Sequence, residues 1–222
     1  MTDTPSSRQH RIKTRVGSIA VFENGAGTPI VFWPSLFSDH RLFSHVVRLL
    51  GNDWRSLCID GPGFGQSDPP QGEIQTDIYA DTVLEVLDSL KIEKAFIAGC
   101  SWGGQIAAHV GTKAPTRVLG ALIMNSPLGP SRGGHHFEIL GTRWFGSKLF
   151  WGNGVARSFF SKATRKRYPE RVRDFVRVFQ SFNREAAAQT ARTVLTRFAG
   201  LEAVLPRLTV STTLLMGAED RL

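Results

Sequence analysis

The chain of 222 residues lacks several features that would place it in a special class of protein. It has two cysteines, Cys58 and Cys100, which are too few for a disulfide framework; both fall in apolar runs, so we expect buried free thiols. No window approaches the ~18 uninterrupted apolar residues of a membrane-spanning helix. The polar residues 1–11 contain no apolar signal-peptide core. These absences favour a cytoplasmic protein with no membrane partner.

Negative charge is scarce in the second half of the chain. Residues 1–128 carry 11 Lys+Arg and 12 Asp+Glu, a net of −1, whereas residues 129–222 carry 16 and 7, a net of +9, which together give +8. A basic half can attract nucleic acid or anionic lipid. Its arginines, however, recur at helical spacing as on a solvated face, and no nucleic-acid-binding motif accompanies them. We expect no nucleic-acid partner, and a homo-oligomer is compatible with the sequence.

Strand-like and helix-like segments alternate through the first 128 residues. Residues 29–33 (PIVFW) form a continuous apolar run, and residues 40–50 place Leu42, Val46 and Leu49 at helical spacing. Such alternation predicts an α/β fold, a mostly parallel sheet with helices on both faces. The expected strands are 11–16, 18–23, 29–33, 55–59, 94–98 and 118–124, with an edge hairpin turning at Gly17, and the expected helices are 40–50, 77–90 and 102–113.

The alternation stops after Pro127. Residues 129–208 show helical periodicity without a clear strand, the clearest helices being expected at 168–182 and 184–198, and strand character returns at 211–216. The sequence therefore predicts three segments, which are a core over 1–128, a helical cap over 129–208 and a return to the core over 209–222.

The predicted helical insert is rich in aromatic residues. Aromatic side chains commonly line small-molecule pockets, so one hypothesis is that they bind a small, largely apolar substrate. The other hypothesis is that they form the core of the insert itself. The residues concerned are Phe137, Trp144, Phe145, Phe150, Trp151, Phe159 and Phe160.

The strongest chemical signal is GCSWGG at residues 99–104, between a predicted strand and a predicted helix. This is the setting of a G-x-S-x-G nucleophile elbow, in which Ser101 takes a strained conformation that exposes its hydroxyl. Gly99 and Gly103 are needed because side chains there would collide, and Gly104 should let the helix pack close to the sheet. The helix N-terminus adds partial positive charge and free N–H groups.

A glycine-rich segment at residues 60–67 (DGPGFGQS) also follows a predicted strand. A phosphate cradle is one interpretation, but the segment lacks both G-x-G-x-x-G before a helix and the G-K-[ST] ending. Pro62 also removes an N–H that a cradle would use. We therefore expect a rigid turn that shapes a wall of the active site.

Two further loops follow predicted strands and complete a candidate site. With a serine nucleophile at a strand-to-helix turn, the oxyanion hole combines the N–H of the next residue, here Trp102, with one from the loop after the third strand. Leu36 or its neighbour would supply the second N–H. A carboxylate at the end of a late strand can orient a catalytic histidine. Asp220 is the first choice and Glu219 the alternative, because Asn125-Ser126 offer no acid.

The ordered motifs PIVFWPSLFSD, DGPGFGQSD, GCSWGG and TLLMGAEDR resemble the α/β-hydrolase superfamily, in its large group of cofactor-free esterases, lactonases, carbon–carbon bond hydrolases and haloperoxidase-like proteins. The resemblance implies Ser101 as nucleophile, Asp220 as acid and the backbone N–H groups of Leu36 and Trp102 as oxyanion hole, with no cofactor and no metal. Pro34-Ser35 replace the usual His-Gly, which implies a differently shaped hole. A serine at the elbow argues against dehalogenase or epoxide hydrolase chemistry.

The resemblance also implies a histidine base after the acid, beyond one more strand. Only Arg221 and Leu222 follow Asp220, so we expect the last strand and helix to be missing, which would leave residues 214–216 exposed and the chain inactive as written. We expect the whole protein to be a serine hydrolase acting on a small, largely apolar ester, lactone or related acyl substrate. The alternative is an inactive α/β-hydrolase-like fragment or a non-catalytic small-molecule binder. The histidines present are His10, His40, His45, His109, His135 and His136.

Overall fold

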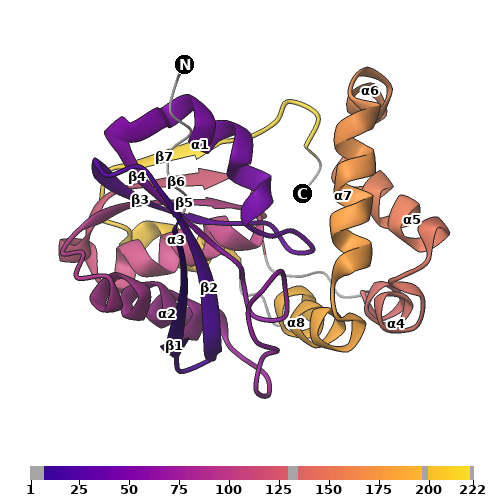
Figure 1. Cartoon of the computed structure of the whole chain (residues 1–222), viewed down its shortest axis with the longest axis horizontal. Coiled ribbons are helices and arrows are strands. Elements are labelled where there is room, and N and C mark those ends of the chain that lie inside the picture. Colours follow the sequence, from indigo (N-terminus) through magenta and orange to yellow (C-terminus); the bar gives the residue numbers. More distant parts are fainter. Residues whose placement is uncertain (1–7, 130–134, 197–199, 221–222) are drawn as a thin grey trace.

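The computed structural model describes residues 8–129, 135–196 and 200–220, and its centre is a seven-stranded sheet (Figure 1). The strand order is β1-β2-β4-β3-β5-β6-β7. The strands are β1 (Arg8–Thr14), β2 (Gly17–Asn24), β3 (Thr28–Trp33), β4 (Trp54–Ile59), β5 (Ala95–Cys100), β6 (Val118–Met124) and β7 (Thr212–Leu215).

The sheet is mostly parallel, as predicted. Strands β4, β3, β5, β6 and β7 run parallel to one another, whereas β1 and β2 form an antiparallel hairpin and β2 is antiparallel to β4. Gly17 makes the hairpin turn with φ +116°, a conformation that side chains rarely adopt. The chain therefore begins on the antiparallel edge of a parallel sheet.

Helices cover both faces of the sheet (Figure 1). The first face carries α1 (Ser44–Leu50) over a small core that includes Phe32, Phe43 and Cys58. On the second face, α2 (Thr76–Ser89) and α3 (Trp102–Lys113) pack over the main core. Helices on both faces shield β3 from water on both sides. Its residues can therefore all be apolar, which explains the continuous apolar run.

One expected helix, over 40–50, is interrupted in the structure. A 3-10 turn, His40–Phe43, precedes α1, and the Asp39 side chain caps that turn by accepting from the Arg41 N–H at 3.0 Å. Periodicity alone could not separate these two segments, because a short 3-10 turn and the first turn of an α-helix place apolar residues similarly.

The helical insert comprises five helices among the described residues, which are α4 (His136–Phe145), α5 (Leu149–Phe159), α6 (Lys162–Arg167), α7 (Pro169–Ser181) and α8 (Arg184–Thr196). Helices α7 and α8 confirm the predicted helices at 168–182 and 184–198, apart from residues 197 and 198, which lie outside the described part. The predicted loop at 129–134 also lies almost wholly outside it. The segment boundaries at 128 and 208 stay predictions.

The insert lies beside the end of the sheet toward which β6 and β7 point (Figure 1). Within it, α4 packs on α8 and α5 packs on α7. Over residues 8–129, 135–196 and 200–220, no helix combines the length and hydropathy required to cross a membrane.

The last described strand, β7, forms the other edge of the sheet. Leu214, Leu215 and Met216 are exposed there, as the sequence predicts for a sheet that ends at this strand. An exposed, apolar edge strand is a template for pairing with further backbone.

Candidate active site

Ser101 occupies a sharp turn between β5 and α3. Its backbone adopts φ 53° and ψ −112°, a conformation that costs energy for a residue with a side chain. Its N–H donates to the Met124 carbonyl at 2.8 Å, which ties the turn to β6. The strained geometry is that of a nucleophile elbow, in which the hydroxyl stands above the sheet edge.

The glycines around Ser101 are required by close backbone approach, as predicted. A Cβ on Gly99 would lie 2.0 Å from the Gly103 carbonyl oxygen, and a Cβ on Gly103 would lie 2.0 Å from the Trp33 carbonyl oxygen. A Cβ on Gly104 would meet the Ser126 hydroxyl at 2.0 Å, so this glycine also lets α3 approach β6. No larger residue fits these positions without moving the turn.

Ser126 supports the elbow in a way that the sequence did not reveal. This buried hydroxyl donates to the Ser101 carbonyl at 2.8 Å and lies 3.1 Å from the Met124 carbonyl. A serine directly after a strand is too common to signal such a role, since short polar residues occur in most loops.

Asp220 lies after β7 and is half-buried. Its carboxylate accepts a hydrogen bond from the Asn125 amide at 2.6 Å, and its N–H donates to the Gly217 carbonyl at 3.0 Å. Asn125 has φ 45° and donates its own N–H to the Leu215 carbonyl at 2.8 Å. The Asn125 side chain thereby joins the ends of β6 and β7. The sequence analysis considered Asn125 only as a position that offers no carboxylate.

The pKa of Cys100, the residue before Ser101, responds to burial and to the charge of Asp220. Burial raises the pKa of the Cys100 thiol to about 11, and the negative charge of Asp220 is the second cause. The geometry agrees, because Asp220 accepts from Asn125 and the preceding residue, Met124, pairs with Cys100 across β5 and β6. Cys58 is buried as expected, whereas Cys100 is half-buried rather than buried.

The loop after β3 carries the predicted oxyanion donor. Leu36 and Phe37 are buried, Phe37 has φ 60°, and the Ser38 N–H closes a turn on the Ser35 carbonyl at 3.2 Å. Within the described part of the chain, the N–H groups of Leu36 and Trp102 donate to no acceptor. Trp102 opens α3, where the first N–H groups lack helical acceptors.

The glycine-rich segment forms a tight turn held by Asp60. The buried Asp60 carboxylate accepts from the Gln66 N–H at 2.8 Å, and a Cβ on Gly65 would lie 2.0 Å from it. The Pro62 carbonyl accepts from the Thr190 hydroxyl of α8 at 2.8 Å. The turn thus anchors the helical insert to the body, which supports a rigid wall over a phosphate cradle.

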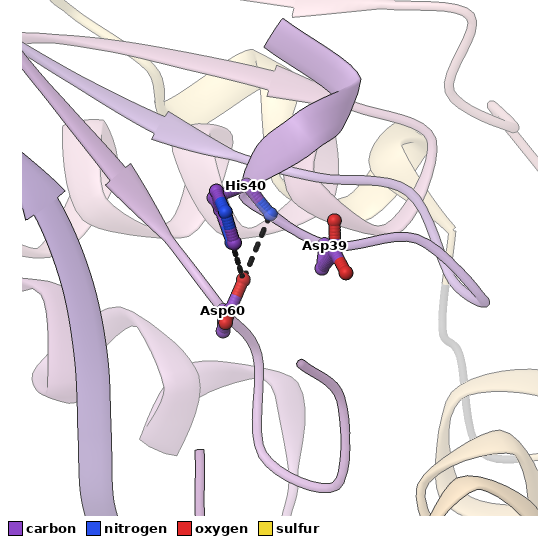
Figure 2. A group of neighbouring side chains, drawn as sticks. All are labelled: Asp39, His40 and Asp60. Carbon is purple, nitrogen blue, oxygen red and sulfur yellow. Dashed lines mark hydrogen bonds and ion pairs between the residues drawn. The ribbon is translucent and has the colours of Figure 1, made fainter. Parts of the chain in front are cut away.

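Asp39, His40 and Asp60 form a compact acidic cluster (Figure 2). Both the N–H and Nδ1 of His40 lie 2.8 Å from one Asp60 oxygen, and Arg41 pairs with Asp39. Three such side chains could hold a metal ion. Here, however, each carboxylate already accepts N–H donors, and Arg41 compensates the charge of Asp39. The cluster is therefore better explained as a set of hydrogen bonds that holds the loop after β3 in place than as a metal site. A polar cavity of about 260 Å³ adjoins it.

Aromatic rings connect the loop after β3 to the helical insert. Phe37 contacts Phe179 of α7 at 5.2 Å and Phe159 of α5 at 6.3 Å between ring centroids, and Phe64 contacts Phe182 at 5.1 Å. These rings form a largely buried apolar cluster beside the predicted oxyanion loop.

Four histidines have side-chain partners that are neither Ser101 nor Asp220. His10 bonds to Glu23, His40 to Asp60, His45 to Arg48 and His135 to Glu138, so these side chains serve other parts of the structure.

Comparison with known proteins identifies the family. The model of the alpha/beta hydrolase fold family matches residues 28–202, and the chain belongs to this family. The AB hydrolase superfamily protein YisY of Bacillus subtilis is 33% identical over 127 residues, which cover 55% of this chain and 46% of the relative. The 3-oxoadipate enol-lactonase 1 of Acinetobacter baylyi is 36% identical over 97 residues, 44% of this chain and 36% of the relative.

The fold has a close structural counterpart. The crystal structure of a hydrolase from Pseudomonas aeruginosa superposes with a TM-score of 0.85 at 23% identity, covering 96% of this chain and 81% of that one. The chain spans less than half the length of the two curated relatives described above.

Proposed function

We propose that the protein carrying this chain is a serine hydrolase that cleaves a small, largely apolar ester, lactone or related acyl substrate. Ser101 is the nucleophile, Asp220 orients the base, and the N–H groups of Leu36 and Trp102 stabilise the oxyanion. The base is a histidine that lies beyond this chain. The main support is the strained backbone of Ser101. Strain of this kind destabilises the fold, and it is typical of a serine that a strand-to-helix turn holds ready as a nucleophile.

The proposed reaction proceeds through an acyl-enzyme. The Ser101 hydroxyl attacks the substrate carbonyl carbon while its proton passes to the histidine, and the negative oxygen that forms accepts the two backbone N–H groups. The carbon–oxygen bond then breaks, and the leaving oxygen takes the proton from the histidine. Water repeats the sequence on the acyl-enzyme, releasing the carboxylic acid and restoring the serine.

Two observations support the substrate class. The apolar cluster of Phe37, Phe159 and Phe179 lies beside the predicted oxyanion loop, and apolar surroundings suit an uncharged acyl group better than a highly charged one. The relative from Acinetobacter is named an enol-lactonase, a hydrolase of a cyclic ester. The aromatic rings favour an apolar acyl group, and the name of the relative favours an ester-type bond as the target.

The test compares this chain with a version extended through the coding sequence that follows it. With nitrophenyl esters and small lactones, the extended protein should turn over, whereas the 222-residue chain should show negligible activity. In the extended protein, Ser101→Ala should lower kcat/KM by a factor on the order of 10⁴ or more. Ser89→Ala, at an exposed serine of α2, is the matched control.

Full activity in Ser101→Ala would contradict the proposal. A folded, extended protein that binds these substrates and hydrolyses none of them would instead favour the non-catalytic binder.

A further inference from the structure

Helices α4 and α5 present large apolar side chains outward. The exposed fractions are Phe137 74%, Leu140 50%, Trp144 67%, Phe145 46%, Leu149 62% and Phe150 63%. We call these six residues the aromatic face. Soluble proteins rarely expose a contiguous apolar surface of this kind unless it binds a partner.

The aromatic face is continuous across the two helices. Phe145 contacts Phe150 with ring centroids 5.6 Å apart, and it approaches Trp151 at 6.4 Å. Trp151 in turn contacts Phe137 at 5.5 Å. The consecutive helices α4 and α5 therefore share one aromatic surface rather than presenting two separate ones.

The inward sides of α4 and α5 are built mainly from small residues. Ile139, Gly141 and Thr142 are buried on α4, and Gly152 and Ala156 are buried on α5. An ordinary amphipathic helix turns its large apolar residues toward the protein. Here α4 buries Ile139, and Trp151 and Val155 of α5 are partly buried, but the six residues of the aromatic face stay exposed, so packing among the described residues does not account for that face.

Positive charge surrounds the aromatic face. Residues 135–196 carry 12 Lys and Arg against 4 Asp and Glu, a net of +8. Lys148 is exposed between Phe145 and Leu149, and Arg157 is exposed two turns beyond Phe150 on α5. Large apolar side chains accompanied by Lys and Arg are characteristic of helices that lie in a lipid–water interface.

We propose that the aromatic face docks on an anionic lipid surface. The aromatic and leucine side chains enter the headgroup region while Lys148, Arg157 and the other cations of the insert face the lipid phosphates. Peripheral docking requires no spanning helix, so the absence of a spanning run, on which the expectation of no membrane partner rested, does not bear on it. The proposal is independent of the proposed hydrolase function.

Two other occupants fit the surface less well. A second copy of this chain would bring two regions of net charge +8 together, and like charges oppose such a contact. A segment that continued the sheet would pair with β7, and Figure 1 shows β7 and the α4–α5 pair on opposite sides of α7. Charge complementarity therefore favours anionic lipid.

The test is co-sedimentation of the protein with vesicles of phosphatidylcholine, with and without phosphatidylglycerol. Binding should be strong only with the anionic lipid and should weaken as salt is raised. The double variant Trp144→Ser/Phe150→Ser should weaken binding by on the order of 10-fold or more, because two apolar anchors are lost. Leu49→Ser, at a 74% exposed leucine of α1, should leave binding unchanged.

Folding and fluorescence keep the result interpretable. Substitutions at exposed positions change stability little, so thermal unfolding should be the same in all variants. Vesicles should shift the tryptophan emission to the blue, and Trp144→Phe should bind like the parent while losing most of that shift. Ser101→Ala should bind normally, which separates this proposal from the catalytic one.

Three outcomes would overturn the proposal. Equal binding by the double variant and the parent would exclude the aromatic face. Equal loss in Leu49→Ser would show non-specific adhesion. Self-association without vesicles that the double variant abolishes would identify a second copy as the occupant.

Discussion

The body of the protein and the α4–α5 pair of its helical insert use aromatic residues in opposite ways. In the body, Trp33, Tyr79 and Trp102 are fully buried behind the elbow, with ring centroids 5.1 to 5.9 Å apart. On α4 and α5, Phe137, Trp144 and other large rings are exposed. The body is near neutral, whereas the insert is strongly basic.

The contrast indicates a division of labour. Close packing in the body holds Ser101 in a conformation that an isolated turn would not keep, which is what a preorganised nucleophile needs. The insert contributes Phe159 and Phe179 to the apolar cluster beside the predicted oxyanion loop and presents the rings of the aromatic face outward. Substitutions should therefore have large structural effects in the body and small ones on the outer side of the insert.

The sharpest test compares two glycines. Gly103→Ala should destabilise the protein by about 3 kcal/mol or more, because the new Cβ would lie 2.0 Å from the Trp33 carbonyl oxygen, which is backbone. Gly154→Ala in α5 has nothing within 4 Å of the new Cβ, so it should stabilise the helix by ~0.5–1 kcal/mol. Urea unfolding measures both, and equal effects would remove the contrast between the regions.

Alkaline pH should weaken the body rather than the insert, since both cysteines lie in the body. Burial raises the pKa of Cys58 to about 12 and that of Cys100 to about 11, from an ordinary 9.0. The neutral thiol is thus favoured by folding, and its contribution is fully present below pH 9 and lost as the pH rises toward 11 and 12. The loss should be on the order of 2 kcal/mol.

Cys58→Ala should flatten this alkaline decline in a pH series of urea midpoints, whereas Trp144→Ser in the insert should leave its slope as in the parent. A decline of the same steepness in Cys58→Ala and the parent would show that other groups control it.

The junction between β6 and β7 offers a smaller, catalytic test that rests on the proposed function. In the extended protein, Asn125→Gly keeps a backbone that tolerates φ 45° but removes the amide that holds Asp220 at 2.6 Å. We expect kcat to fall about 10-fold with KM unchanged, the effect of losing a hydrogen bond to a charged group. Asn52→Gly, at an exposed asparagine of the 3-10 turn Gly51–Asp53, is the control. A rise in KM alone would assign Asn125 to substrate binding.

The sequence by itself determined the features that depend on local pattern. Alternating strands and helices follow from periodicity, so the mostly parallel sheet, its antiparallel hairpin and helices α7 and α8 were all predicted. The elbow followed too, because a turn that tight permits only glycine at Gly99 and Gly103. Steric clashes of this kind arise between residues that are close in the chain, so they can be predicted from the sequence.

Tertiary structure decided what depends on residues distant in the chain. Asn125 and Asp220 are 95 positions apart in the chain, and His40 and Asp60 are 20 apart. No local sequence pattern therefore predicts either contact. The same holds for the aromatic residues of the insert. Periodicity shows that a helix has an apolar side, but only the packing of α4 on α8 and of α5 on α7 decides which residues are buried, and here it left most of the large aromatic residues of α4 and α5 exposed.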